Sequence, residues 1–176
     1  MLPVDIVSGQ SVARVRRGEL VFVDSFESWY ERERNRMITT LLLATGDVEL
    51  AIEGVDEACS RAFERWDRVV VMDSPTGWVY RVAFNHARRV ARRRTFEQRL
   101  WRRPVASGDV PDVAGEVWER VRELSPRQRH VVVLRHVGGL KEREIAATLG
   151  ISRGTVSSTL RDAHERLGRL LDDPKE

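Results

Sequence analysis

The segment from Lys141 to Leu160, "KEREIAATLGISRGTVSSTL", decides the fold of the C-terminal half because it has the spacing of a helix-turn-helix. Ala146 stands where two helices would approach closely, and Gly150, four residues later, can adopt the positive φ of a tight turn. Val156, six residues further on, would pack the second helix on the first. The other inward apolar positions are Ile145, Leu149, Ile151 and Leu160. The spacing therefore predicts a helix-turn-helix.

The outer face of the second helix in this segment carries side chains that suit DNA. Arginine can bond guanine, and serine or threonine can bond bases or phosphates, when the N-terminal part of such a helix enters the major groove. The candidate residues on this helix are Arg153, Thr155, Ser157, Ser158 and Arg161, and Lys141 at the start of the motif is a further candidate for the DNA contact. An ordinary pair of antiparallel helices with a polar outside is the simpler alternative. The Ala–Gly–Val register, a cap at Ser152 and this outer face together favour DNA binding.

Charge is distributed unevenly along the 176 residues, although the formal net charge is only +3. Residues 47–60 contain five acids and no base, whereas residues 74–103 contain nine arginines and one acid, Glu97. This distribution indicates two different surfaces, of which the second suits phosphates. A solvated helix face is the alternative interpretation of the arginine run.

The composition excludes several classes of site. Cys59 is the single cysteine, so an intrachain disulfide, a structural zinc site or a redox pair of cysteines cannot form, and on its apolar stripe it is most simply a core residue. The histidines are scattered over different predicted helices, and no glycine-rich phosphate loop is present. We therefore expect no enzyme activity, no cofactor and no metal. The most apolar run, Ile38–Ala44, is far too short to span a bilayer, so we expect a cytosolic protein without membrane insertion.

The first half, residues 24–102, has the apolar pattern of three helices. They are expected from about Asp24 to Gly46, from a cap at Asp47 to Trp66, and from Ser74-Pro75 to about Trp101. The expected inward positions are Val48, Ile52, Val55, Cys59, Ala62 or Phe63 and Trp66 in the second helix, and Trp78, Val82, Ala83, Ala87 and Val90 in the third. Residues 1–23 show no clear period and are interpreted as a loose, unassigned arm. No segment of the chain reads as a dependable strand.

The stretch that follows is typical of a linker, because residues 102–116 contain two prolines, two glycines and a serine. We place the linker at residues 103–115 and a second helical unit at residues 116–172. Ser125-Pro126, Gly138-Gly139 and Gly150 divide this unit into four helices. The sequence thus predicts an all-α fold of two small domains, one of three helices and one of four, joined by a flexible linker.

Both halves resemble parts of a known family. The stretch "LSPRQRHVVVLRHVGGLKEREIAATLGISRGTVSSTLRDAHERL", residues 124–167, resembles region 4 of bacterial sigma factors, which contacts the promoter −35 element. A similar signature occurs in response regulators of the LuxR type. The first half, with "GDVELAIEGVDEACSRAFERWDR" followed by "PTGWVYRVAFNHARRVARRR", resembles region 2 of extracytoplasmic-function (ECF) sigma factors of the sigma-70 family. The resemblance covers about 140 residues in the right order, with a short linker in place of region 3.

The resemblance implies that the chain binds core RNA polymerase, at the β′ clamp helices and the β flap. The helix predicted from Asp47 to Trp66 matches the part of region 2 that docks on the clamp helices. Asp56, Glu57, Arg61, Phe63, Glu64 and Trp66 fall in the matching stretch. Phe63 and Trp66 also lie on the apolar stripe, so a core position is the preferred alternative for these two residues.

The resemblance also implies a site for the −10 element. The loop Val69–Thr76 matches the segment that captures a flipped-out base, which offsets the stacking lost when DNA is unpaired. In the following helix an asparagine can bond a base edge and arginines can hold phosphates. The candidates there are Asn85, Arg88, Arg89, Arg92 and Arg93. Trp78 and Tyr80 could stack on bases, with a core anchor as the preferred alternative for Trp78. In this family the linker threads through the polymerase, and a simple tether fits the sequence equally well.

The recognition helix departs from the common pattern of the family. Ser157, Thr159, Arg161 and Asp162 stand where Lys, Arg, His and Arg are common, and Asp56 stands in region 2 where Gln is usual. Fewer basic side chains make fewer phosphate contacts. We therefore expect weaker affinity for the −35 element, with a shallower dependence on salt, and a promoter sequence unlike the common one.

The sequence therefore predicts an alternative sigma factor, a non-catalytic subunit that directs core RNA polymerase to specific promoters and assists their melting. Because ECF factors are usually held inactive by an anti-sigma factor, such a protein is a further candidate partner. The second hypothesis is a stand-alone helix-turn-helix regulator of the LuxR type. That hypothesis does not require an acidic helix, a loop and an arginine-rich helix in series.

Overall fold

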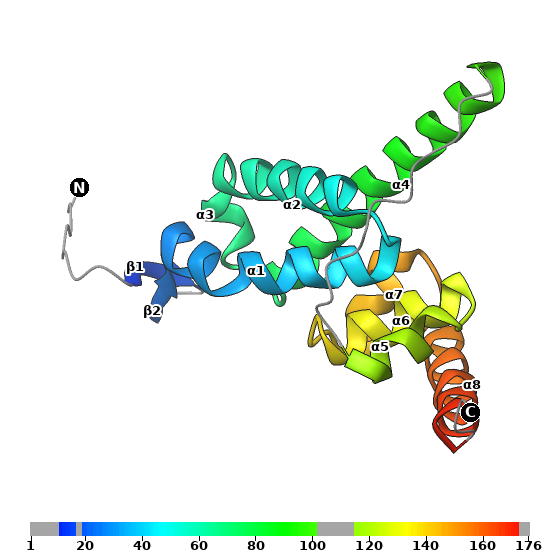
Figure 1. Cartoon of the computed structure of the whole chain (residues 1–176). Helices are drawn as coiled ribbons and strands as arrows, with labels where there is room; N and C mark the ends of the chain where they lie inside the picture. The colour runs from blue at the N-terminus through cyan, green and yellow to red at the C-terminus, as the bar shows by residue number, and fades with distance from the viewer. Residues whose placement is uncertain (1–10, 17–18, 102–114, 173–176) are drawn as a thin grey trace.

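The computed structural model describes residues 11–16, 19–101 and 115–172, and helices dominate them (Figure 1). The first half contains α1 (Phe26–Thr45), α2 (Val48–Phe63), α3 (Trp66–Val69) and α4 (Pro75–Trp101). The second half contains α5 (Gly115–Arg122), α6 (Pro126–His136), α7 (Glu142–Leu149) and α8 (Arg153–Asp172). The predicted all-α architecture is confirmed for both halves. The predicted linker, 103–115, lies outside the described residues except for Gly115, which begins α5.

Local signals place several helix ends where the sequence predicts them. Gly46 ends α1 with a φ of +73°, a left-handed conformation that glycine adopts without a side-chain clash. The Asp47 carboxylate accepts a hydrogen bond from the Leu50 N–H at 2.8 Å and so caps α2. Ser125 begins α6 with a capping box that it shares with Gln128.

In the first half, α2 packs along both α1 and α4. The close approach depends on Gly54, because a Cβ atom at this position would lie 3.0 Å from Leu41 Cδ2 and 3.3 Å from the Ala83 carbonyl oxygen. Met37 and Val55 are fully buried beside it. This packing holds the arginine-rich helix α4 against the acidic helix α2.

In the second half, α8 packs against α5, α6 and α7. Val131 and Val133 of α6, Ile145 of α7, and Val156 and Ala163 of α8 are fully buried. These positions form the core of the second half and hold the helix-turn-helix of α7 and α8 against α6.

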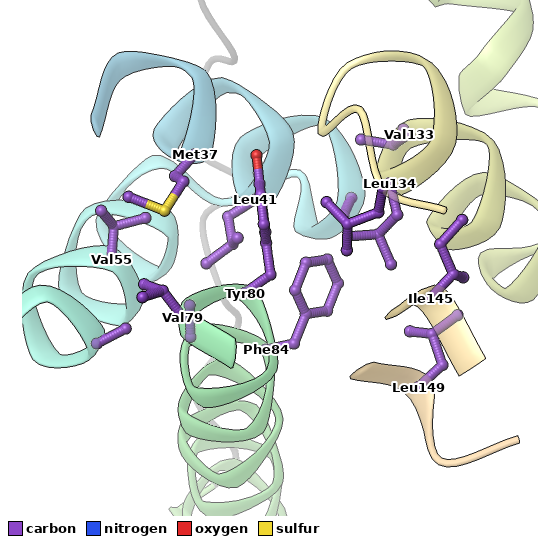
Figure 2. Close-up of a cluster of buried hydrophobic side chains, with 14 of the residues drawn as sticks. Met37, Leu41, Val55, Val79, Tyr80, Phe84, Val133, Leu134, Ile145 and Leu149 are labelled. Atoms are coloured by element: carbon purple, nitrogen blue, oxygen red, sulfur yellow. The ribbon is translucent and has the colours of Figure 1, made fainter. Parts of the chain in front are cut away.

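The two halves are also packed on each other, with α7 against α4 and α6 against α1. The buried apolar side chains of both halves form one cluster. Figure 2 shows Phe84 of α4 between the side chains of the first half (Met37, Leu41, Val55) and those of the second (Leu134, Ile145, Leu149). In this structure the two halves therefore share a core.

The prediction of a loose N-terminal arm without strands is wrong for part of that segment. β1 (Ser11–Arg16) and β2 (Glu19–Asp24) pair antiparallel, with Ser11 opposite Asp24 and Arg16 opposite Glu19. Both strands are short and contain β-branched residues in near alternation, a pattern that favours strands. An isolated two-stranded hairpin is only marginally stable, so the pattern alone gave little support for strands beside strongly periodic helices.

The expected inward positions also need correction. α2 ends at Phe63 instead of continuing to Trp66, and Ile52 is 39% exposed. On α4 the buried positions are Val79, Tyr80, Ala83, Phe84 and Ala87, whereas Trp78, Val82 and Val90 are only partly buried. The buried face is shifted because α4 packs against α7 as well as α2, which one helical stripe does not reveal.

Candidate nucleic-acid interface

The helix-turn-helix consists of α7, the turn at Gly150 and α8. Gly150 has a φ of +67°, and its N–H donates to the Ala146 carbonyl and ends α7. Ser152 Oγ accepts a hydrogen bond from the Thr155 N–H at 3.0 Å, which begins α8. Val156 is fully buried. The geometry predicted from the spacing of Ala146, Gly150 and Val156 is therefore confirmed.

The predicted DNA contacts of this motif fall into two groups by the exposure of their side chains. Lys141, Arg153, Ser157 and Arg161 are exposed. The Arg153 side chain remains 77% exposed although its Nε lies 3.4 Å from Glu142 Oε2. A pair this exposed contributes little and would exchange readily for a phosphate. These four side chains are accessible to a DNA groove.

Thr155 and Ser158, in contrast, serve the first turn of α8. Thr155 Oγ1 lies 2.8 Å from Ser152 Oγ, and Ser158 Oγ donates to the Thr155 carbonyl at 3.2 Å. Both residues are partly buried. Their hydroxyls stabilise the start of the helix. A base that contacts either hydroxyl would therefore compete with these hydrogen bonds.

A basic pocket of about 370 Å³ adjoins this face, at the N-terminal ends of α7 and α8. It is lined by Arg135, Lys141, Glu142, Arg143 and Arg153. Four basic side chains against one acid, beside two helix N-termini whose dipoles favour anions, suit a phosphate group. Sequence reasoning missed Arg135 and Arg143. Arg135 lies on α6, outside the motif, and its Nη1 donates to the Leu140 carbonyl at 3.1 Å.

The arginine-rich face of α4 is the second candidate surface. Asn85, Arg89, Arg92 and Arg93 are exposed. Arg88 is partly buried because it reaches toward the second half, where its Nη1 donates to the Leu149 carbonyl at 3.4 Å. Burial, together with the charge of Arg92, lowers the pKa of Arg88. The five predicted residues thus lie on one helix, but one of them already contacts α7.

The acidic and basic blocks of the sequence meet in space. Arg94 Nη1 lies 3.0 Å from Asp47 Oδ2, and its Nη2 lies 3.8 Å from Glu53 Oε2. Glu53 Oε1 is 2.9 Å from His86 Nε2, and Arg89 Nη2 is 3.2 Å from His86 Nδ1. The interpretation of the two blocks as separate surfaces is therefore wrong at this junction, where the acids of α2 pair with α4.

The residues expected to bind polymerase lie mostly on the solvent side of α2. Asp56 accepts a hydrogen bond from Arg34 Nη2 at 3.2 Å, and Glu57 accepts one from Arg61 Nε at 2.7 Å. Glu64, just beyond the helix, is exposed. Acidic and basic groups therefore alternate on a surface that a partner can reach.

The two aromatic residues of that set behave differently. Phe63 is 61% exposed and packs edge-on against Phe26, with ring centroids 5.1 Å apart, so the core alternative is wrong for Phe63. Trp66 is only 9% exposed, and its Nε1 donates to the Asp24 carbonyl at 2.9 Å. The core alternative is correct for Trp66, whose hydrogen bond to Asp24 fixes the segment just before α1.

The two aromatic residues near the start of α4, Trp78 and Tyr80, also differ in burial. Tyr80 is completely buried, its hydroxyl lies 2.9 Å from Thr40 Oγ1, and burial raises its pKa to about 12. A ring in this position cannot stack on a base, so that hypothesis is wrong for Tyr80. Trp78 is partly buried and packs against the core, as its alternative predicts. The first turn of α4 is held by Trp29 Nε1, which donates to Thr76 Oγ1 at 3.1 Å.

Known proteins share this arrangement. The family model described as sigma-70, region 4 matches residues 114–167. The RNA polymerase sigma-E factor of Streptomyces avermitilis is 28% identical over 159 residues, which cover 84% of each chain. The ECF RNA polymerase sigma factor SigG of Mycobacterium tuberculosis is 26% identical over 199 residues, covering 91% of this chain and 50% of the relative. The solved structure of the sigma factor RpoE with the anti-sigma factor NepR from Bartonella quintana has the same fold, with a TM-score of 0.69 at 19% identity over 85% of this chain and 98% of the other.

The helix-turn-helix and its family match define a DNA-binding domain of the sigma-70 region 4 class. With both halves included, the chain is similar to RNA polymerase sigma-E factors and to an ECF RNA polymerase sigma factor over most of its length. Over the part of the chain that the structure describes, no helix is long and apolar enough to cross a membrane.

Proposed function

We propose that this chain is an alternative sigma factor that directs core RNA polymerase to specific promoters through two DNA contacts and assists promoter melting without catalysis of its own. The observation that carries the proposal is the order of three surfaces in one chain. They are the solvent side of α2, the arginine-rich face of α4 and the outer face of α8. A stand-alone regulator would use the last surface and would have no need of the first two.

At the −35 element, α8 enters the major groove by its N-terminal end. Arg153 and Arg161 are the exposed arginines in the first ten residues of that helix and read or clamp the duplex, and Ser157 lies between them on the same face. The basic pocket, with Arg135 and Arg143, holds a backbone phosphate beside the groove and fixes the register of the helix.

At the −10 element, α4 presents Asn85 to a base edge and its arginines to the phosphates of the separated strand. Arg92 is exposed, and Arg88 joins it once it leaves the α7 carbonyl. Tyr80 supports this face from inside, where its hydroxyl ties α4 to Thr40 of α1. Melting is favoured because the strand that α4 holds is no longer available for pairing.

Core polymerase binds on the solvent side of α2. The carboxylates of Asp56 and Glu57, each paired with an arginine, give this surface its charged groups. The exposed ring of Phe63 gives it an apolar anchor. Aromatic residues are enriched at the centre of protein interfaces, and polar or charged groups form the rim around them. We assign residues 24–102 to the polymerase and −10 unit and residues 116–172 to the −35 unit. An anti-sigma factor that covers the first unit is the expected negative partner.

The test is run-off transcription with purified bacterial core polymerase on a library of genomic promoter fragments. We expect discrete transcripts that core polymerase alone does not make, and co-purification of the chain with the core enzyme. A chain that binds duplex DNA but neither co-purifies with core polymerase nor yields transcripts would instead be a stand-alone regulator.

A further inference from the structure

Two histidines of the second half face each other across the contact between α6 and α8. His136 is the last residue of α6, and His164 lies in the middle of α8, 28 positions further along the chain. Their Nε2 atoms are 3.0 Å apart, and their ring centroids are 5.2 Å apart at an interplanar angle of 57°. Both residues are exposed. The pair therefore brings two imidazole nitrogens to one point of the surface that solvent can reach.

The core beneath the pair fixes the position of both backbones. Val133, about one turn before His136, and Ala163, the residue before His164, are completely buried where α6 packs against α8. A ligand that binds both rings therefore needs to adjust only the side-chain angles of the two histidines. Groups that are already held in place lose less conformational freedom on binding, so the pair is favourable as a binding site.

The distance between the two nitrogens suits one class of metal ion. Neutral imidazole is a common ligand of Zn²⁺, Cu²⁺ and Ni²⁺. With metal–nitrogen bonds of about 2.05 Å, two nitrogens 3.0 Å apart subtend an angle of about 94° at the ion. Cu²⁺ and Ni²⁺ prefer square-planar or tetragonal sites, in which neighbouring ligands subtend about 90°. A tetrahedral Zn²⁺ ion would require the nitrogens to be about 3.3 Å apart.

A bound ion must replace the hydrogen bond that the two rings share. In that hydrogen bond one Nε2 carries the proton and the other accepts it, so the two rings are different tautomers. An ion needs the electron pairs of both Nε2 atoms, so the donor ring must carry its proton on Nδ1 instead. Burial, the charge of His164 and the charge of Arg135 lower the pKa of His136, and the charge of Arg135 also opposes a bound cation. Over the residues that the structure describes, the pair is not part of a group of three or more possible ligands, so water or an anion fills the other positions. We therefore expect an ion that exchanges with solvent.

We propose that His136 and His164 form a two-histidine site for a Cu²⁺ or Ni²⁺ ion. The ion bridges the C-terminal end of α6 and the middle of α8, and so holds α8 against the helix that supports it. The site shares no residue with the basic pocket or with the side chains assigned to DNA, so it does not depend on the function proposed above.

The ligands can be identified by pulsed electron paramagnetic resonance of Cu²⁺ added to the untagged full chain. At one equivalent of Cu²⁺ we expect a tetragonal spectrum with coupling to two imidazole nitrogens. His136→Ala and His164→Ala each leave one ring of the pair. Each variant should show coupling to one nitrogen only and bind Cu²⁺ at least about tenfold more weakly, because the second ligand is lost.

His86→Ala is the matched control, because it also removes one of the four histidines but lies on α4, in the first half. It should keep the spectrum and the affinity of the wild type. If the wild type and both variants of the pair bind Cu²⁺ equally well, or if His86→Ala loses as much affinity as they do, the ion is bound elsewhere and the proposal is overturned.

A second measurement uses the stability that binding adds. An ion that binds only the folded chain raises the midpoint of thermal unfolding, and with free Ni²⁺ at a hundredfold excess over its dissociation constant we expect a rise of roughly 5–10 °C. Mg²⁺ at the same concentration prefers oxygen ligands and should give no rise. The double variant His136→Ala/His164→Ala should not respond to Ni²⁺. No rise in the wild type would leave the pair with a hydrogen bond only, and an equal rise in the double variant would place the ion elsewhere; either result overturns the proposal.

Discussion

Lowering the pH should weaken the packing of the second half on the first through His130. The ring is partly buried between Phe84 and the C-terminus of α1, where it forms a hydrogen bond with the backbone of Ala44. Burial lowers the pKa of His130 from 6.5 to about 4, and the positive charges of Arg88 and Arg129 act in the same direction. The hydrogen bond to Ala44 opposes them but does not outweigh burial.

The magnitude follows from this pKa difference. A difference of 2.5 units at about 1.36 kcal/mol per unit is worth about 3 kcal/mol, an upper figure because water reaches a partly buried ring. Since the packed state favours the neutral ring, the free energy of unfolding is unaffected above pH 7. It falls as the pH drops below 6.5 and stops falling near pH 4. About 2 kcal/mol of the loss is expected by pH 5.

The assay is urea unfolding at pH 7.5 and pH 5.0, for the wild type and for His130→Gln. Glutamine does not titrate, and its amide can still donate a hydrogen bond. The wild type should therefore lose about 2 kcal/mol more than His130→Gln between the two pH values. Equal losses would show that His130 is already exposed and protonated in the native chain, and would refute the reasoning.

The other expected outcomes concern the two DNA contacts, the polymerase surface and the core. Arg153→Ala and Arg161→Ala should weaken −35 duplex binding, whereas Arg88→Ala and Arg92→Ala should slow open-complex formation in a permanganate assay and leave −35 binding intact. Four variants that behave alike would contradict this division. A salt titration with duplex DNA should give a slope of log affinity against log salt no steeper than about −5, from the few cations on the α8 face and its pocket. Phe63→Ala should reduce affinity for core polymerase about tenfold with little change in unfolding. Tyr80→Phe should lower the free energy of unfolding by about 1 kcal/mol in urea, because Thr40 loses its partner; an unchanged value would mean that water replaces the hydroxyl.

The features that were predicted from sequence are those set by neighbours in the chain. Gly46, Asp47 and Ser125 mark helix ends because each forms a capping interaction within a few residues. The turn at Gly150 follows from the same kind of local requirement, a positive φ. Such interactions have a fixed spacing, so one sequence is enough to recognise them.

The features that were missed depend on residues far apart in the chain. Arg94 and Asp47 pair across 47 positions, and Arg88 and Leu149 across 61. Neither pair has a spacing that a helical pattern contains. Phe63 lies on the apolar stripe of α2, but it stands at the end of the helix, where its neighbour is Phe26 and the rest of the ring faces solvent. The stripe therefore predicted burial where the end of the helix leaves the ring uncovered.

Two arginines of α4, Arg94 and Arg88, differ in how strongly the rest of the chain holds them away from DNA. The pairs that Arg94 forms with α2 are partly exposed, and exposed ion pairs contribute about 1 kcal/mol or less, so DNA phosphates can compete with them. Arg88 differs, because its contact with Leu149 belongs to an apolar interface with Phe84 and His130. Moving Arg88 away from Leu149 therefore costs one hydrogen bond and some apolar burial. DNA phosphates therefore compete more easily for Arg94 than for Arg88.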